Sequence, residues 1–154
     1  MATLPLVTGP LNKILRTKSE PVKKFDKKLW KLLEDMKETM YKTNGVGLAA
    51  PQIGLNIRVA VCRFNHDTSH ETVVEMINPV ITAFSANKED GEEGCLSIPG
   101  RFDQVRRHVW VTVKFQDRKG KEQILKMTGF NARIVQHEVD HLNAILYIDH
   151  IGES

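Results

Sequence analysis

The sequence predicts an α+β fold in which antiparallel strands pack around a central metal-binding helix. Apolar residues recur at helical spacing in residues 26–43 and again in residues 129–143, and several strand-like runs lie between these two segments. The second helix carries two histidines on the same face as the apolar residues that bury it. This shared face predicts that the helix lies at the centre of the molecule.

The composition predicts one domain that spans residues 1–154. Hydrophobic residues make up 41% of the chain, which is enough for one core, and neither a repeat nor a low-complexity segment divides it. The formal charge of +3 is mild. It gives no argument for a nucleic-acid partner, because such proteins usually carry a concentrated basic face.

The chain has two cysteines, Cys62 and Cys95, too few for a disulfide framework. Cys62 lies in an apolar run, which favours a small buried side chain. Residues 1–10 lack the charged start and apolar stretch of a signal peptide, and no apolar run approaches membrane-spanning length. We therefore expect a cytoplasmic protein with no membrane partner.

The first predicted helix covers Asp26–Thr43. Asp26 can cap its start, and Asn44-Gly45 is a stop signal. Lysines and acids fill the face opposite the apolar one. The apolar residues at helical spacing are Leu29, Leu32, Leu33, Met36 and Met40.

Residues Gly45–Gly54 contain three glycines, one proline and two alanines, and predict neither a good helix nor a regular strand. Such small residues let a backbone come close to another group. The next strand-like runs are Ile57–Arg63, Thr72–Ile77 and Val80–Phe84. The polar residues His66–His70 between the first two predict a surface loop rather than a metal site.

Residues Val105–Gln116 and Glu122–Met127 predict a hairpin around Asp117–Gly120. Apolar and polar residues alternate along its first strand, as they do in a half-buried strand. His108 falls on the polar face of that strand. We expect it to be solvated and not to bind a metal.

The last predicted helix covers Gly129–Asn143, with Thr128 as its candidate cap. The residues that share one stripe along it are Phe130, Ile134, His137 and His141.

This helix contains the sequence His137-Glu138-Val139-Asp140-His141, whose histidines can both reach one ion. Cys95 offers a thiolate as a third ligand, and Glu138 lies close enough to act on a metal-bound water. Three protein ligands leave one coordination position open, which is typical of a catalytic site. The alternatives are two core histidines with satisfied hydrogen bonds and a buried cysteine without chemistry.

Three segments in this order resemble the peptide deformylase family. They are residues 45–52 (Gly-Val-Gly-Leu-Ala-Ala-Pro-Gln), residues 93–97 (Glu-Gly-Cys-Leu-Ser) and residues 136–142 (Gln-His-Glu-Val-Asp-His-Leu). The resemblance extends from Ile14 to Asp149, nearly the whole chain. It implies a hydrolase that removes the formyl group from the N-terminal formyl-methionine of nascent polypeptides and releases formate.

The resemblance implies that Cys95, His137 and His141 bind the metal and that Glu138 is the general base and acid. The family's metal is usually Fe²⁺, and zinc, nickel or cobalt can take its place. The ligand types alone do not distinguish iron from zinc, because a Cys/His/His set suits both.

The resemblance also implies that the Gln52 side chain and the Leu96 backbone amide stabilise the developing oxyanion, and that Gly47 contacts the substrate backbone. The substrate methionine needs an apolar pocket. The candidates for the pocket wall are Val46, Phe130, Ile134 and the His137 ring, and plain core packing is the alternative explanation for each of them.

The implied partners are N-formyl-methionyl peptides and the ribosome. Some family members dock on the ribosome with a longer C-terminal helix, whereas only a turn or two could follow Asp149, which argues against that route here. Two other functions stay open: a related metallohydrolase such as a peptidase, and a metal-stabilised binding domain. A closed site with four protein ligands would favour the binding domain, with His108, His150 and Cys62 as its only candidates in principle.

Charged residues near the site lead to two further expectations. We expect Glu93 and Arg107 to form an ion pair that supports the site. An apolar residue is commoner than Arg133 at its position in the family, so we expect the charge of Arg133 to alter the rim of the pocket.

Overall fold

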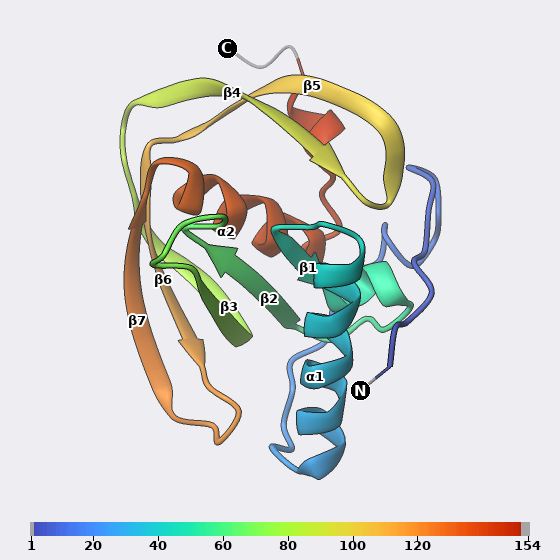
Figure 1. Cartoon of the computed structure of the whole chain (residues 1–154). Helices are drawn as coiled ribbons and strands as arrows, with labels where there is room; N and C mark the ends of the chain where they lie inside the picture. The colour runs from blue at the N-terminus through green and yellow to red at the C-terminus, as the bar shows by residue number, and fades with distance from the viewer. Residues whose placement is uncertain (1, 152–154) are drawn as a thin grey trace.

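The computed structural model describes residues 2–151 and shows an α+β protein with antiparallel sheets (Figure 1). The two α-helices are α1 (Lys27–Lys42) and α2 (Gly129–Leu142), and two short 3₁₀ helices are η1 (Ala50–Ile53) and η2 (Tyr147–His150). The strands are β1 (Gly47–Ala49), β2 (Val59–Phe64), β3 (Thr72–Phe84), β4 (Lys88–Cys95), β5 (Ile98–His108), β6 (Trp110–Gln116) and β7 (Glu122–Thr128).

The strands form two sheets. One has five strands in the order β1-β2-β3-β6-β7, and the other is the two-stranded hairpin β4–β5; every pairing is antiparallel. Helix α2 contacts strands of both sheets and lies between the five-stranded sheet and the hairpin (Figure 1).

Helix α2 buries its apolar face on the large sheet, where Ala132, Val135 and Val139 join a core cluster with Val111 and Val113 of β6. Helix α1 covers β1 and β2 through a second cluster. Its Asp26 accepts a hydrogen bond from the amide of Leu29, as the capping prediction required. Thr128 occupies the cap position of α2, but its side chain makes no capping hydrogen bond.

Strand β3 is one strand where two were predicted. The predicted break falls at Asn78-Pro79, where the register shifts and Asn78 has a φ of 54°. The Asn78 side chain stabilises this bulge, because it accepts a hydrogen bond from Val22 N at 2.8 Å and donates one to Val22 O at 2.9 Å. The strand therefore bends at this point and continues.

The prediction of one strand over Val105–Gln116 is wrong, because β5 ends at His108 and β6 begins at Trp110. The break occurs where the Ser85 hydroxyl accepts hydrogen bonds from the amides of Val109 at 2.8 Å and Trp110 at 3.3 Å. These bonds replace the strand-to-strand backbone hydrogen bonds at this point, and the chain passes from the β4–β5 hairpin to the five-stranded sheet.

Two strands were not expected. Five of the eight residues of β4, Lys88–Cys95, are charged, so it carries no apolar alternation, and it exists through its pairing with β5. The short strand β1 lies in Gly45–Gly54, where neither helix nor strand was predicted. It pairs with β2 and leads into η1.

Other local predictions are confirmed. Cys62 is fully buried and unpaired, and residues 65–70 form an exposed turn. No helix among residues 2–151 is both long enough and apolar enough to cross a membrane.

The C-terminal segment is held to the start of the chain. The carboxylate of Asp149 in η2 accepts two hydrogen bonds from Arg16, at 2.6 and 3.1 Å, and one from the amide of Leu146 at 3.0 Å. Residues 152–154, at the end of the C-terminal tail, lie outside the described part of the chain. The same holds for Met1, the first residue of the segment considered as a signal peptide.

We predict that Asp149→Asn lowers the free energy of unfolding by about 1 kcal/mol at pH 7, because a bidentate ion pair is lost at a partly exposed site. The hydrogen bond from Arg16 lowers the pKa of Asp149. The carboxylate therefore contributes stability above its unfolded-state pKa of about 3.9 and loses this contribution as the pH falls through the folded value. Urea unfolding should be measured at pH 7 and in acid, and the free energies of unfolding of wild type and variant should become equal at low pH.

The control is Glu122→Gln, whose exposed carboxylate makes a 3.4 Å ion pair with Lys114. It should cost less than about 0.5 kcal/mol at either pH. A difference for Asp149→Asn that persists unchanged in acid would contradict the assignment to this ion pair.

Candidate metal centre

Three metal-ligand side chains converge between α2 and the end of β4. One ligand atom from each of Cys95, His137 and His141 can be chosen so that all three lie within 4.8 Å of one another. The helix places the two histidines one turn apart on one face, and the hairpin brings Cys95 to the same point.

The distance between Cys95 Sγ and His141 Nε2 is 3.4 Å. Two ligands of a tetrahedral ion, with bonds of about 2.3 Å to sulfur and about 2.1 Å to nitrogen, lie roughly 3.6 Å apart. The spacing, the burial and the donor types all fit a transition-metal ion. Within residues 2–151 this is the one cluster of three or more His, Cys, Asp or Glu side chains with such convergence.

His137 is oriented by the buried carboxylate of Glu93, whose Oε1 lies 2.9 Å from His137 Nδ1. A carboxylate can only accept, so Nδ1 carries the proton and Nε2 is left for an ion. Burial alone would lower the pKa of His137, but hydrogen bonds to Cys95 and Glu93 outweigh it and raise the pKa to about 10, so an ion that binds at Nε2 would displace a proton from this ring. The ring of Tyr147 stacks on the His137 ring at a centroid distance of 6.0 Å.

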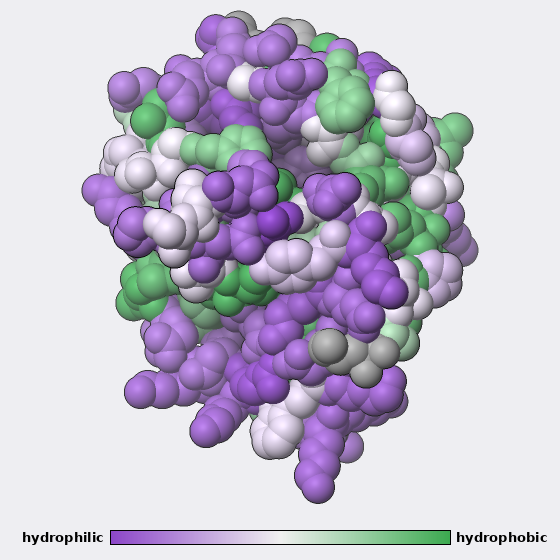
Figure 2. All heavy atoms as spheres, in the orientation of Figure 1, coloured by the Kyte–Doolittle hydropathy of each residue, from purple (hydrophilic) through white to green (hydrophobic). Residues whose placement is uncertain are grey.

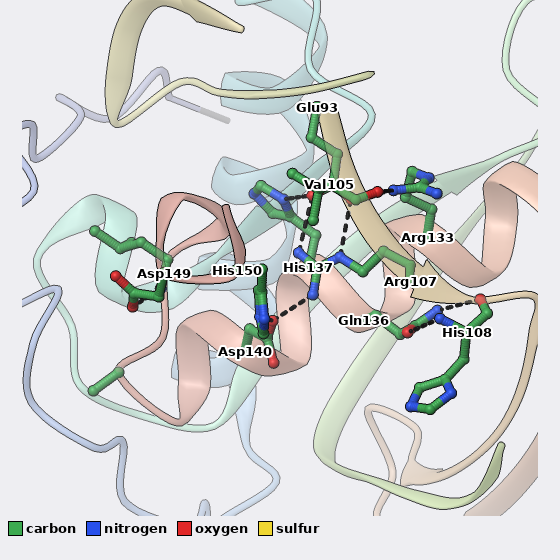
Figure 3. Close-up of polar contacts among 12 residues, drawn as sticks. Glu93, Val105, Arg107, His108, Arg133, Gln136, His137, Asp140, Asp149 and His150 are labelled. Atoms are coloured by element: carbon green, nitrogen blue, oxygen red, sulfur yellow. Dashed lines mark hydrogen bonds and ion pairs between the residues drawn. The ribbon is translucent and has the colours of Figure 1, made fainter. Parts of the chain in front are cut away.

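Glu93 also pairs with Arg107, as the sequence predicted. Arg107 donates from Nε and Nη2 to the two carboxylate oxygens at 2.9 Å each, and its Nη1 lies 2.5 Å from Asp140 (Figure 3). Burial would raise the pKa of Glu93, but the bonds from His137 and Arg107 hold it well below its usual range. Asp140 in turn lies 2.8 Å from His150 Nε2.

Arg133 lines the cavity, as expected, but its charge is paired. The residue is only 7% exposed, and its Nη1 donates a hydrogen bond to Glu93 Oε2 at 2.7 Å (Figure 3). The hairpin covers this face of α2, so the charge is paired inside and does not stand on an open rim.

Glu138 follows His137 on helix α2 and is 4% exposed. Burial raises the pKa of Glu138 to about 7. Its Oε1 is buried with no hydrogen-bond partner, which is a costly state for a carboxylate unless a water or ligand occupies the space beside it. Gly47 makes room for this side chain, because a Cβ there would lie 2.8 Å from Glu138 Cδ.

Gln52 is held by both ends of its amide. Its Oε1 accepts from Ala49 N at 2.9 Å, and its Nε2 faces Cys95 Sγ at 3.5 Å and Ser97 Oγ at 3.2 Å. The donor end of the amide therefore points at the ligand cluster.

A cavity of about 400 Å³ opens beside the cluster, within the range of small-molecule sites. The face in Figure 2 is hollowed below the β4–β5 hairpin, with hydrophobic atoms beside the hollow. Phe130 is 47% exposed at the rim, whereas Ile134 is buried. The predicted site residues that line the cavity are Val46, Gly47, Gln52, Cys95, Leu96, Phe130, Ile134, His137 and Glu138.

Residues far apart in the sequence complete the site in ways that were not predicted. Tyr147 and Ser97 carry no sequence signal for contact with a ligand or with Gln52. Asp140 and Arg133 had a usable signal, because each lies on α2 within a turn of a ligand histidine. His108 is half-buried, whereas a solvated side chain was predicted: the centroids of the His108 and Phe84 rings lie 4.2 Å apart, and His108 Nδ1 is 2.8 Å from Ser85 O.

Comparison with known proteins is consistent with this geometry. A profile of the family described as polypeptide deformylase matches residues 4–154. Peptide deformylase 1 of Bacillus cereus is 46% identical over 147 residues, which cover 96% of this chain and 91% of that protein. The crystal structure of peptide deformylase from Thermotoga maritima is 39% identical, with a TM-score of 0.92 over 99% of both chains.

A peptide deformylase from Acinetobacter baumannii, crystallised with Met-Ala-Ser bound, is also similar. It is 39% identical, with a TM-score of 0.89, and the match covers 97% of this chain and 99% of that one.

We predict that the purified chain retains about one Co²⁺ per molecule after gel filtration, because three converging ligands bind far more tightly than two. Cys95→Ala and His141→Ala should each lose most of this metal, as measured by elemental analysis. Cys62→Ala is the matched control, since it removes the other thiol of the chain, which is not one of the three converging side chains. Equal metal content in Cys95→Ala and Cys62→Ala would contradict the site.

Proposed function

The chain belongs to the peptide deformylase family, whose members remove the formyl group from the N-terminus of nascent polypeptides, and we propose that it does so at the Cys95/His137/His141 cluster. Residues 1–154 are the proposed catalytic domain. The observation that carries the assignment is the buried, unpartnered carboxylate oxygen of Glu138 beside three converging metal ligands.

Cys95, His137 and His141 are the proposed metal ligands, and Fe²⁺ is the proposed ion. A dication held there supplies a Lewis acid that acidifies a water molecule and stabilises negative charge on the formyl oxygen. One thiolate and two imidazoles leave a coordination position open, which a hydrolytic reaction needs. The fixed Nδ1 proton of His137 supports the orientation of its ring toward the ion.

Glu138 is the proposed general base and then general acid. Its pKa of about 7 suits both tasks near neutral pH, since the carboxylate can accept a proton from the attacking water and return it to the leaving amine. The absence of a side chain at Gly47 supports this role, because it leaves room for the carboxylate at the cavity wall.

Gln52 and the backbone amide of Leu96 are the proposed oxyanion donors. The carbonyl end of the Gln52 amide is held by Ala49 N, so its NH₂ group is directed at the cluster without further ordering. A donor placed in advance where charge develops is worth about 3 kcal/mol of transition-state stabilisation.

The cavity supports a formyl-methionyl peptide as substrate. Val46, Phe130 and Ile134 are the proposed walls of the methionine pocket, and Gly47 is the proposed contact to the peptide backbone. The segments Gly45–Gly47 and Pro99–Arg101 both line the cavity, which supports binding of the peptide as an added strand.

The metal-stabilised binding domain considered from the sequence receives less support. A binding domain with a closed site would need a fourth protein ligand, and the convergent cluster in residues 2–151 has three. His108 and His150, considered as fourth ligands, are engaged with Ser85 and Asp140. We propose that the reaction takes place in the cytoplasm and that the protein meets its substrate at the ribosome.

We predict that the anaerobically purified, iron-loaded protein releases formate from formyl-Met-Ala-Ser. Glu138→Ala and Glu138→Gln should lower kcat at least ~100-fold, because the proton acceptor is lost. Their metal content should equal that of wild type, since Glu138 is not a ligand. Fully loaded wild type that releases no formate would overturn the proposal, and cleavage of unformylated peptides would favour the peptidase.

We predict that Gly47→Ala lowers kcat/KM about 100-fold, because the added Cβ displaces the Glu138 carboxylate. Formate release and metal content should be measured together, and metal content should not change. Gly120→Ala is the matched control: it strains a left-handed turn between β6 and β7, with a φ of 84°, and should cost stability without changing kcat/KM.

A further inference from the structure

Arg133 is a buried arginine one helical turn before His137 on α2. Burial of a guanidinium costs several kcal/mol unless its hydrogen bonds are made, so the partners of such a group are informative. The reaction proposed above gives this side chain no task.

The Arg133 guanidinium contacts both strands of the hairpin. Its Nη1 donates to Glu93 Oε2 and to the carbonyl of Val105 on β5, both at 2.7 Å. Its Nη2 donates to the carbonyl of Glu89 on β4 at 3.0 Å. One side chain of the ligand-bearing helix therefore ties β4, β5 and the Glu93 carboxylate together.

The hairpin is shaped to receive this group. Gly91 on β4 is the register partner of Val105, and a Cβ at Gly91 would lie 2.7 Å from Arg133 Cζ and 2.8 Å from Nε. These distances are shorter than real contacts, so any larger residue at position 91 would push the guanidinium out. The absence of a side chain at Gly91 on β4 therefore provides the space that the Arg133 guanidinium of α2 occupies.

With Arg133 in place, Glu93 accepts four hydrogen bonds. Oε1 accepts from Arg107 and His137, and Oε2 accepts from Arg107 and Arg133. Removal of Arg133 would leave Oε2 with one donor in a buried site. The carboxylate could then turn to recover a partner, and Oε1 would no longer be held against His137 Nδ1.

We infer that Arg133 is a positioning residue for His137, which acts through Glu93, and that Gly91 provides the space that this role requires. The inference rests on the proposed metal centre. An outer residue that orients a metal-binding histidine typically changes metal affinity by 10- to 100-fold.

The test uses Arg133→Met, which keeps the apolar stem and removes the donors, and Gly91→Ala, which displaces the guanidinium from the other side. Each full-length protein is loaded with Co²⁺. The dissociation constant is measured by chelator competition, the thiolate-to-cobalt and ligand-field absorption bands are recorded, and kcat and KM are measured separately.

The control is Arg106→Met. Arg106 also links the two strands, through Asp90 at 3.1 Å, but it does so on the exposed face of the hairpin. A variant that only loosens the hairpin should resemble this control.

We expect Arg133→Met and Gly91→Ala to weaken Co²⁺ binding by roughly 10- to 100-fold and to shift the absorption bands. We also expect kcat to fall, with KM within about twofold of wild type, since the proposed methionine-pocket residues Val46, Phe130 and Ile134 are unchanged. Arg133→Lys keeps the charge with fewer donors and should give an intermediate affinity. Arg106→Met should match wild type in all of these measurements.

Three results would overturn the inference. The first is a Co²⁺ affinity and an absorption spectrum of Arg133→Met that equal those of wild type. Even if the urea midpoint of the metal-free variant were lower, the role of Arg133 would then be structural alone. The second applies if Arg133→Met does not fold: Co²⁺ affinities and absorption spectra of Gly91→Ala and Arg133→Lys that equal those of wild type would then overturn the inference. Wild type that binds no Co²⁺ would overturn the proposed centre and this inference together.

Discussion

The buried carboxylate of Glu93 accepts hydrogen bonds from three residues and connects the hairpin to helix α2. Since all four bonds are charge-assisted or lie in a buried site, loss of one partner would leave a costly unpaired group. The orientation of His137, the closure of the hairpin and the burial of Arg133 all depend on this one group. Asp140 balances the second arginine charge, so the buried network holds two carboxylates and two guanidiniums.

This network explains the division of the site between two elements. Helix α2 supplies two imidazoles and Glu138, whose separations are set by helical geometry alone. The hairpin supplies the thiolate, and its position is set by packing on the helix. The cavity lies between them, and the short strand β1 forms its other wall, where Gly47 lets Glu138 approach the backbone.

The helices, the β6–β7 hairpin and the pair of histidines on one helix face could be predicted because their signals are local. Caps, apolar periodicity and the i, i+4 histidine pair depend on residues within a turn or two of one another. Strand β4 could not be predicted, because its charged residues show no alternation and its pairing with β5 stabilises it. The bulge at Asn78 was missed for a related reason, since its stability comes from Val22, far back in the chain.

The sequence by itself determined the proposed ligand types, the spacing of the two histidines, the proposed base between them and the resemblance of three ordered segments to one family. Tertiary structure alone decided that Arg133 is buried on Glu93, that His108 packs on Phe84 and that Tyr147 stacks on His137. The physical reason is the range of the interactions. A helix dictates the direction of side chains one turn apart, whereas a buried charge acquires its partner only when distant strands close over it.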